Sequence, residues 1–399
     1  MKYVSVQDLV EQNQVVIKTG PFGTQLKASE YVSFGTPVLN VRNLGFATVN
    51  TDKLEMVSDG TLERLSAHKL VTGDIVFGRK GAVERHAFIS ESENGWMQGS
   101  DCIRLRVLAD SVNPRFLSYY FLTKRHRAFM MSMCSHGTTM ASLNQKIIEK
   151  IIVPLPERSI QDKVVEILAT LDKQIATNQK INENLEQQAQ AIFANEFLSL
   201  ESLPDGWKRG SLIDIADYLN GLAMQKYRPA ADEVGIPVLK IKELRQGCCD
   251  ATSEVCSPNI KTNYIIHDGD VIFSWSGSLL VDFWCGGICG LNQHLFKVTS
   301  SVYDKWFYYA WTKHHLERFI AVAADKATTM GHIKRDELSK AEVLIPNKAD
   351  YNRIGSLLHP IYDLIITNRI ECKKLAETRD ALLPKLMSGE IDISGVNYE

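Results

Sequence analysis

Two sets of residues have types and spacings that resemble catalytic motifs. Asn113-Pro114-Arg115-Phe116 comes within one residue of the Asn-Pro-Pro-aromatic motif with which amino-methyltransferases hold a flipped base. Asp363, Glu371 and Lys373 faintly imitate a nuclease triad, but they lie in a heptad-patterned stretch where charged residues usually form a solvated helix face. The first set lacks the second proline, a counterpart in the other half of the chain and a preceding glycine-rich cofactor loop, and Pro114 suits the first turn of a helix. A Gly-x4-Gly-Lys-Ser/Thr phosphate loop is also absent. We therefore expect a chain without a catalytic centre.

The cysteines raise the question of a metal site. Five of the eight lie between positions 248 and 289, namely Cys248, Cys249, Cys256, Cys285 and Cys289. No Cys-x2-Cys pair occurs, and Cys285-x3-Cys289 has no matching second pair, so zinc is not favoured. The N-terminus has no apolar leader, so we expect reduced thiols that serve in packing, in a cytoplasmic protein.

Composition excludes several classes of protein. The chain has 399 residues, of which 45% are hydrophobic and 23% charged, and its formal net charge is −2. This composition is typical of globular proteins. The sequence contains no run of about 18 apolar residues, so it predicts no membrane span. The net charge argues against a uniformly basic protein that coats nucleic acid. It leaves room for a local basic face, because residues 1–156 carry 18 Lys+Arg against 14 Asp+Glu.

The strongest pattern is an internal duplication. Similar segments recur in the same order in the two halves: Gly35-Thr-Pro-Val-Leu39 and Gly235-Ile-Pro-Val-Leu239, Gly73-Asp-Ile-Val-Phe77 and Gly269-Asp-Val-Ile-Phe273, and the tyrosine pairs Tyr119-Tyr120 and Tyr308-Tyr309. From position 138 a constant offset of 190 residues relates the two copies. The period is far longer than that of a solenoid repeat. We therefore predict two copies of one domain of mixed short strands and helices, each followed by a long helix.

Heptad spacing predicts that the two long helices pair with each other. One apolar lane recurs every seven residues in both copies: Val164, Leu171, Asn178, Leu185 and Ile192, matched by Ile354, Ile361, Asn368, Leu375 and Leu382. Both lanes carry one Asn at the same position, and a buried Asn fixes the register of such a seam. The alternative is that each Asn is exposed on a helix packed against its own domain. Pro360 predicts a kink or a late start of the second helix.

The predicted boundaries are a domain over residues 1–156, a helix over 157–199, a second domain over 200–346, and a second helix with a tail over 347–399. Antiparallel pairing would place the two domains at opposite ends of the helices. The 28 residues from Val164 to Ile192 span about 42 Å at about 1.5 Å per residue, which corresponds to about 12 base pairs of duplex DNA. A rigid spacer of that length between two similar domains fits recognition of a split DNA site.

These features together resemble the specificity subunits of type I restriction–modification enzymes over essentially the whole chain. The resemblance rests on the duplication, on the repeated Gly-Asp-Ile-Val-Phe-like segments, and on three helix-associated stretches: Pro154-Leu-Pro-Glu-Arg-Ser-Ile-Gln161, Leu168-Ala-Thr-Leu-Asp-Lys-Gln-Ile175 and Leu383-Pro-Lys-Leu-Met-Ser-Gly-Glu-Ile391. The second copy departs from the pattern at Asn347-Lys-Ala-Asp-Tyr351, where the proline-bounded Glu-Gln is lost.

The resemblance implies an α+β fold in which two target-recognition domains alternate with two long helices, paired as an antiparallel coiled coil with pseudo-two-fold symmetry. It implies a non-catalytic subunit whose domains each read one half of a bipartite DNA site. Two methyltransferase subunits would dock near the helices, and motor-nuclease subunits would join them. S-adenosylmethionine, ATP and magnesium would then bind to these partners and not to this chain. The alternatives are a stand-alone methyltransferase or nuclease with an unrecognised site, and a coiled-coil scaffold that binds only protein.

Residue types within the short loops indicate where DNA would be contacted. Cations bind phosphates, whereas amides and guanidinium groups that enter a groove select bases. The candidates in the first copy are Lys18, Lys27, Arg79, Lys80, Gln98, Ser100, Thr138 and Thr139. Those in the second copy are Lys226, Trp275, Ser276, Asn292, Gln293, His294, Thr328 and Thr329. Each loop also fits an ordinary solvated turn, and the basic cluster from Lys124 to Arg127 suits phosphate binding and a solvated helix face equally well.

Overall fold

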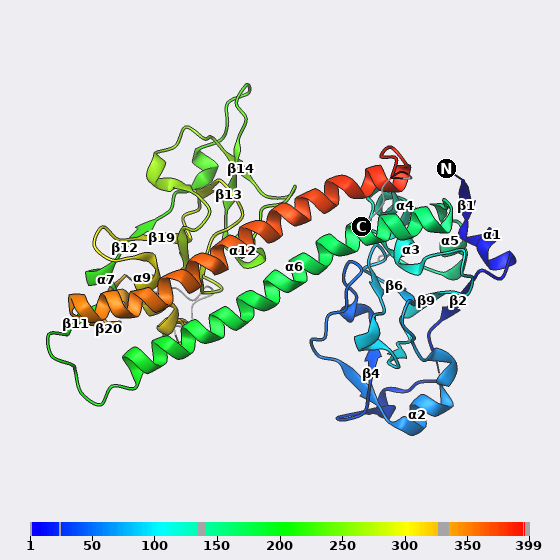
Figure 1. Ribbon diagram of the computed structural model, residues 1–399, viewed down its shortest axis with the longest axis horizontal. Coiled ribbons are helices and arrows are strands. Elements are labelled where there is room, and N and C mark those ends of the chain that lie inside the picture. The colour runs from blue at the N-terminus through cyan, green and yellow to red at the C-terminus, as the bar shows by residue number, and fades with distance from the viewer. Residues whose placement is uncertain (1, 24, 135–140, 326–334, 394, 396–399) are drawn as a thin grey trace. The chain divides into compact units, whose positions relative to one another are not determined.

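The computed structural model describes residues 2–23, 25–134, 141–325, 335–393 and 395. The chain packs into two compact units, unit 1 made of residues 1–172 with 377–399 and unit 2 made of residues 173–376. Two long helices, α6 (Arg158–Phe193) and α12 (Lys348–Ser388), contribute to both units (Figure 1). Within the described ranges, no helix is both long enough and apolar enough to cross a membrane.

Unit 1 is built from short strands and helices. Its strands are β1 (Tyr3–Ser5), β2 (Val15–Thr19), β3 (Tyr31–Val32), β4 (Thr36–Leu39), β5 (Glu55–Val57), β6 (Ile75–Gly78), β7 (His86–Phe88), β8 (Met97–Gln98), β9 (Cys102–Val107) and β10 (Ile152–Pro154). Its shorter helices are α1 (Val6–Glu11), α2 (Asp59–Arg64), α3 (Pro114–Phe121), α4 (Lys124–Cys134) and α5 (Gln145–Glu149). One sheet has the order β2-β9-β6-β7, a second has the order β3-β5-β4-β8, and β1 pairs with β10.

Unit 2 repeats this construction. Its strands are β11 (Lys208–Ser211), β12 (Asp217–Asn220), β13 (Ile236–Leu239), β14 (Val255–Cys256), β15 (Ile265–Ile266), β16 (Val271–Ser274), β17 (Leu280–Phe283), β18 (Cys289–Leu291), β19 (Leu295–Thr299) and β20 (Glu342–Ile345). Its shorter helices are α7 (Leu212–Ile215), α8 (Ile241–Gln246), α9 (Lys305–His314), α10 (Leu316–Asp325) and α11 (Asp336–Ser339). The sheets have the orders β12-β19-β16-β17 and β14-β13-β18-β15, and β11 pairs with β20.

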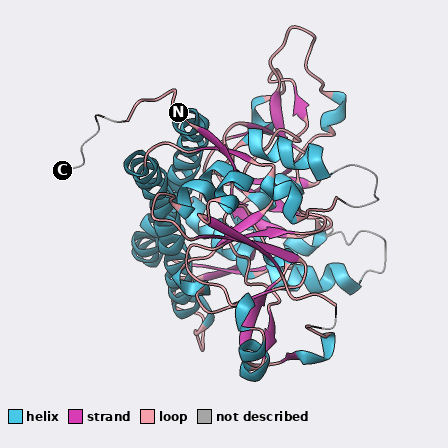
Figure 2. Ribbon diagram, turned by 90° about the vertical axis from the view of Figure 1, so that its right-hand side faces the viewer, coloured by secondary structure: helices cyan, strands magenta, loops and turns pink. Residues whose placement is uncertain are grey.

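The duplication in the sequence is therefore a duplication of topology. The order β2-β9-β6-β7 corresponds strand by strand to β12-β19-β16-β17, and each second sheet contains one parallel pair, β4 with β8 and β13 with β18. Even local details recur, because a serine–aspartate capping box begins both α1 at Ser5 and α7 at Ser211. The strands are short and joined by long loops (Figure 2). The predicted mixture of strands and short helices in each copy is confirmed.

The two long helices pair in an antiparallel manner within unit 2. Along α6 and the π-helical turn Ala194–Leu198 that follows it, successive residues contact successively earlier residues of α12. The Cys372 thiol contacts the Ile175 carbonyl, Asn368 contacts Asn182, and Arg353 bonds to Glu196 in the turn. Arg369 adds an ion pair of 2.8 Å with Glu186. The heptads predict that the helices pair, and the family resemblance implies that they do so antiparallel; both expectations are confirmed here.

The same direction holds in unit 1, where Asp172 of α6 forms an ion pair of 2.9 Å with Arg379 of α12. Val164 and Leu168 of α6 share a hydrophobic core with Leu383, Leu386 and Met387 of α12. The ten predicted lane residues are buried or half-buried: Val164, Leu171, Asn178, Leu185, Ile192, Ile354, Ile361, Asn368, Leu375 and Leu382. Helix α12 begins at Lys348 and continues through Pro360, so a late start at that proline is excluded.

Candidate nucleic-acid interface

Three loops meet at one end of the strands of the β2-β9-β6-β7 sheet in unit 1. The turn after β6 is joined to the loop before β9 by the Arg79 N–H, which donates to the Asp101 carbonyl at 2.8 Å. The loop that follows β2 joins them through the Gly20 N–H, which donates to the Cys102 carbonyl at 2.9 Å. A Cβ on Gly20 would lie 1.9 Å from the Gly99 carbonyl oxygen, so only glycine allows this approach. We call this arrangement the three-loop junction of unit 1.

Unit 2 builds the same junction from different residues. The Trp275 N–H donates to the His294 carbonyl at 3.4 Å, and the Gly221 N–H donates to the Leu295 carbonyl at 3.0 Å. A Cβ on Gly221 would lie 2.2 Å from the Asn292 carbonyl oxygen, so the glycine requirement recurs as well. The backbone of the three-loop junction is thus conserved between the two units, while its side chains differ.

The junction of unit 1 presents cations. Lys80 is exposed and Arg79 is half-buried. Two backbone hydrogen bonds hold their turn against residues 141–143: the Gly81 N–H donates to the Ala141 carbonyl at 3.0 Å, and the Leu143 N–H donates to the Arg79 carbonyl at 2.8 Å. Lys18 lies on β2 directly opposite Arg104 of β9. Lys27 is exposed and Ser100 half-buried. The junction therefore carries Arg79 and Lys80 on a turn that backbone hydrogen bonds hold in place.

Gln98 does not present its amide at the surface. Its side chain is fully buried and donates to the Lys18 carbonyl at 2.9 Å and the Cys102 carbonyl at 3.1 Å. Buried carbonyls at the ends of β2 and β9 need a donor, and the amide supplies it. Gln98 thus holds the backbone beneath Lys18 in place instead of facing a ligand.

Five of the residues predicted in unit 2 form one connected cluster: Trp275, Ser276, Asn292, Gln293 and His294. The Trp275 indole N–H donates to Asn220 Oδ1 at 3.0 Å, and its ring packs against Phe296 with a centroid separation of 5.7 Å. Ser276 Oγ lies 3.0 Å from His294 Nδ1, and Gln293 Nε2 lies 3.3 Å from His294 Nε2. Ser276 and Asn292 are buried, whereas Gln293 and His294 are half-buried, so the latter two are the more accessible polar groups.

Other predicted residues lie apart from the junction or outside the described ranges. Lys226 is exposed at the end of a 3-10 turn, Met224–Lys226. Thr138, Thr139, Thr328 and Thr329 lie outside the described residues. The two glycines of the junctions, Gly20 and Gly221, could have been identified from the repeat, because they directly follow the equivalent strands β2 and β12.

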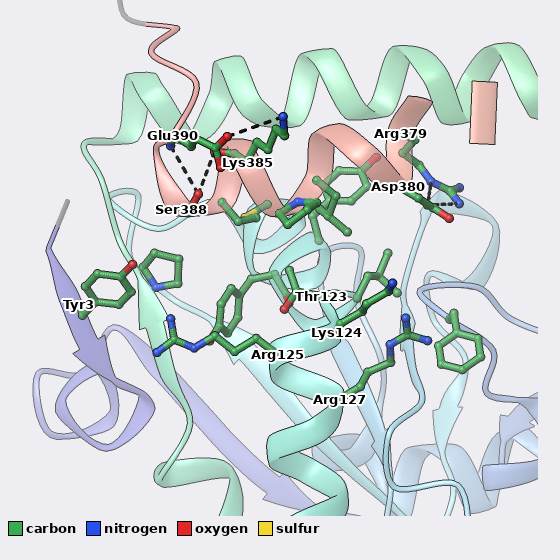
Figure 3. A pocket seen from close by; sticks show the side chains of 18 residues that line it. Tyr3, Thr123, Lys124, Arg125, Arg127, Arg379, Asp380, Lys385, Ser388 and Glu390 are labelled. Atoms are coloured by element: carbon green, nitrogen blue, oxygen red, sulfur yellow. Dashed lines mark hydrogen bonds and ion pairs between the residues drawn. The ribbon is translucent and has the colours of Figure 1, made fainter. Parts of the chain in front are cut away.

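A cavity of about 720 Å³ lies beside α4 in unit 1. Figure 3 shows Lys124, Arg125 and Arg127 of α4 on one side of it and Arg379, Asp380 and Lys385 of α12 on the other. Arg127 lies over the Phe46 ring at 5.3 Å, and Arg125 over the Tyr3 ring at 5.9 Å. The basic cluster therefore covers aromatic rings as well as facing solvent.

The corresponding region of unit 2 is filled by aromatic rings. The repeat matches Leu383, Met387 and Leu122, which line the cavity, with Phe193, Phe197 and Trp311. Trp311 packs edge-on against Phe193 and Phe197 at centroid separations of 5.0 and 5.4 Å. Unit 1 has smaller, non-aromatic side chains at these three positions, and they line the cavity.

Two histidines are buried in the core of unit 1. His86 is hydrogen-bonded to Ser118 at 2.9 Å, and His126 packs against the Phe121 ring at 4.8 Å. Burial lowers the pKa of both imidazoles to about 3, with a smaller contribution from neighbouring cationic groups. Both rings are therefore neutral near pH 7, and they serve the core and not a proton-transfer site.

The motif-like residues have structural roles. Asn113 caps α3, with its Oδ1 accepting from the Arg115 and Phe116 backbone N–H groups at 2.9 and 3.2 Å. Glu371 accepts a hydrogen bond from Asn178, and Asp363 bonds to His359 on its own helix. Among the described residues, no group of three or more His, Cys, Asp or Glu side chains is placed to hold a metal ion.

Comparison with known proteins agrees with this architecture. The chain is 26% identical over 309 residues to the type I restriction enzyme MjaIX specificity subunit of Methanocaldococcus jannaschii, covering 71% of this chain and 70% of that protein. It is 20% identical to the putative MjaX specificity subunit of the same organism, over 97% of this chain and 93% of that one. The type I restriction–modification S subunit from M. genitalium shares the fold, with a TM-score of 0.59 at 13% identity over 98% of this chain and 96% of that chain.

The family model of the type I restriction modification DNA specificity domain matches twice, over residues 17–187 and 204–376. These two matches together cover most of the chain, and they coincide with the two topological copies. The chain therefore belongs to the type I restriction–modification DNA specificity family.

Proposed function

We propose that this chain reads a bipartite DNA sequence, with the three-loop junction of each unit contacting one half. The observation that carries the proposal is the pair of equivalent backbone bonds, Arg79 to Asp101 and Trp275 to His294, which hold the same scaffold under different side chains. Equivalent backbone with different side chains on its loops suits two modules that bind the same kind of ligand but select different sequences.

The chemistry of each junction suggests its contacts. In unit 1, Arg79 and Lys80 are suited to phosphate oxygens or to the O6 and N7 acceptors of guanine. In unit 2, Gln293 and His294 offer hydrogen-bonding groups near the Trp275 ring, which suits readout of base edges with less phosphate attraction. The second copy is less basic, since residues 200–346 carry 16 Lys+Arg against 18 Asp+Glu. This suits a complex in which partner subunits supply part of the affinity for DNA.

The recognition domains are proposed to span residues 1–156 and 200–346, with the helices over 157–199 and 347–399 setting the spacer between half-sites. Two methyltransferase subunits would dock against the paired helices, and motor-nuclease subunits would join that assembly in the cytoplasm. We propose that the chain itself is non-catalytic, so that S-adenosylmethionine, ATP and magnesium are bound by those partners.

Methylome sequencing tests this proposal directly. The chain is expressed together with its methyltransferase subunit in a host that lacks other adenine methylation. We expect one split motif with a constant spacer of about one helical turn. Methylation at a single continuous motif would contradict bipartite reading. Methyl transfer to DNA by the purified chain alone would contradict the non-catalytic role.

A further inference from the structure

Cys249 and Cys289 of unit 2 lie in direct contact, with their sulfur atoms 3.4 Å apart. They are 40 residues apart in the sequence, so the fold and not chain proximity brings them together. We propose that this pair is a peroxide-sensitive dithiol that closes into a disulfide beside the three-loop junction of unit 2.

The backbone around each cysteine is well anchored. Cys289 begins β18 and pairs with Ile266 of β15, while the next residue, Gly290, pairs with Val238 of β13. Cys249 lies two residues after Gly247, which caps the C-terminus of α8 with a φ of 74°. It precedes a turn in which the Asp250 carboxylate accepts a hydrogen bond from the Thr252 N–H at 2.8 Å. Two thiols held in contact from two ordered segments need little movement to form a bond.

The two thiols differ in accessibility in the way that stepwise oxidation requires. Cys249 is half-exposed, whereas Cys289 is fully buried, so an oxidant from solvent meets Cys249 first. The hydrogen bond from Cys289 lowers the pKa of the Cys249 thiol, and the Lys373 ammonium adds to this effect. The same contact, together with burial, raises the pKa of Cys289. Cys249 is therefore the member of the pair that ionises and reacts.

Hydrogen peroxide is the oxidant for this crosslink. The Cys249 thiolate attacks one peroxide oxygen, the O–O bond breaks, and a sulfenic acid and hydroxide form. Cys289 then loses its proton and attacks the Cys249 sulfur, which forms the S–S bond and releases water. The two cysteine sulfurs lose two electrons in total, and the peroxide is reduced to two molecules of water.

The disulfide would join the loop after α8 to the first residue of β18. That strand leads directly into Asn292, Gln293 and His294 of the junction, so the crosslink would restrain the segment that carries these side chains. The consequence for DNA reading rests on the proposed function, but formation of the crosslink does not.

Peptide mapping of the full-length chain tests the crosslink without any DNA. The reduced protein is treated with hydrogen peroxide, blocked with an alkylating agent, digested without reductant and analysed by mass spectrometry. We expect a peptide linked through Cys249 and Cys289, a mass lower by about 2 Da that reductant restores, and slower amide exchange over residues 289–294.

The exposed neighbour Cys248 provides the matched control. C248S should form the crosslink as the native chain does, whereas C249S and C289A should not, and thermal unfolding of each variant establishes that it is folded. If C289A does not fold, C249S alone decides. A Cys248–Cys249 disulfide, a Cys249 sulfinic acid with Cys289 still alkylatable, or two unreacted thiols would each overturn the proposal.

Discussion

The side-chain amide of Asn368 donates a hydrogen bond to Asn182 Oδ1 at 2.9 Å across the paired helices of unit 2. Both side chains are buried, and the Asn182 amide donates in turn to the Ile365 carbonyl at 3.2 Å. The 190-residue offset of the repeat matches Asn182 with Cys372 and Asn368 with Asn178. The equivalent pair in the repeat is therefore Asn178 and Cys372, and at that position the Asn178 amide donates to Glu371 Oε2 at 2.8 Å.

Removing one member of the Asn182–Asn368 pair should cost more than removing both. In Asn182→Leu the Asn368 amide loses its buried partner, so we expect unfolding to become easier by about 1–3 kcal/mol. The double variant, with both residues changed to Leu, should recover most of that loss because no buried polar group remains unsatisfied. Denaturant unfolding of Asn182→Leu, Asn368→Leu and the double variant completes a double-mutant cycle. A loss of stability in the double variant equal to the sum of the two single losses would show that the bond contributes nothing.

The sequence predicted the pairing but not the partners. Heptad lanes identify which side of a helix is apolar, so Asn178 and Asn368 could be assigned to the seam. They do not say which residues face each other, because that depends on the axial offset between two helices. Asn182 lies outside the predicted lane, and its role appears only once the antiparallel register is known.

The candidate interface was likewise only partly predictable. Glycine-bounded loops and residue types identified Arg79, Trp275 and His294, which the fold brings into equivalent junctions. The burial of Gln98 could not be foreseen, because a glutamine in a loop looks the same whether its amide faces solvent or a strand carbonyl. The cavity beside α4 required knowledge of which side chains pack together across distant parts of the chain.

Acid should destabilise unit 1 through its two buried histidines. Their pKa in the folded state is about 3, below the ordinary value of 6.5, so the unfolded chain binds more protons between these limits. The stability contributed by neutral His86 and His126 is complete above pH 6.5 and declines as pH falls toward 3, by about 1.4 kcal/mol per pH unit for each.

Denaturant midpoints at pH 7.5, 6.0 and 4.5 measure this decline. His126→Phe keeps a ring against Phe121 and removes one titrating group, so its stability should fall less steeply with acid than that of the native chain. A parallel slope in the variant would mean that burial does not lower the pKa of His126, because the folded and unfolded chains would then bind its proton equally. Burial also lowers the pKa of His315 in unit 2 to about 4. This residue adds to the loss of stability in acid equally in the native chain and in the His126→Phe variant.

Reciprocal substitutions at the matching positions 193 and 383 should affect stability to different extents. Phe193→Leu introduces the residue found at the matching position in unit 1, and it removes contacts with Trp311, so we expect a loss of about 1–3 kcal/mol. Leu383→Phe introduces the unit 2 residue beside a cavity of about 720 Å³, which has room for the ring, so stability should change by less than about 1 kcal/mol. Thermal unfolding of the two variants compares them directly; a large loss in Leu383→Phe would show that the cavity is not available to that side chain.

Charge removal at the first junction should weaken DNA binding through phosphate contacts. In the assembled complex, the double change of Arg79 and Lys80 to Ala should reduce affinity and lower the slope of log affinity against log salt by about 0.9 for each lost contact. Lys180→Ala, which removes an exposed cation from α6, is the matched control and should leave the slope unchanged. Fluorescence anisotropy at several salt concentrations measures both, and equal slopes in all three proteins would place the phosphate contacts elsewhere.

Changes at the second junction should alter one half of the recognised sequence and leave the other intact. The imidazole of His294 and the amide of Gln293 are its more accessible polar groups, whereas Trp275 packs against Phe296 and supports them. Replacing Gln293 and His294 with Ala removes hydrogen-bonding groups without touching the backbone bond from the Trp275 N–H, so we expect relaxed selection at about one or two base pairs of a single half-site. Methylome sequencing of hosts that express the variant and the native chain measures this, since the unaltered half and the spacer serve as internal controls. Relaxation in both halves, or a changed spacer, would mean that the two junctions do not read the DNA independently.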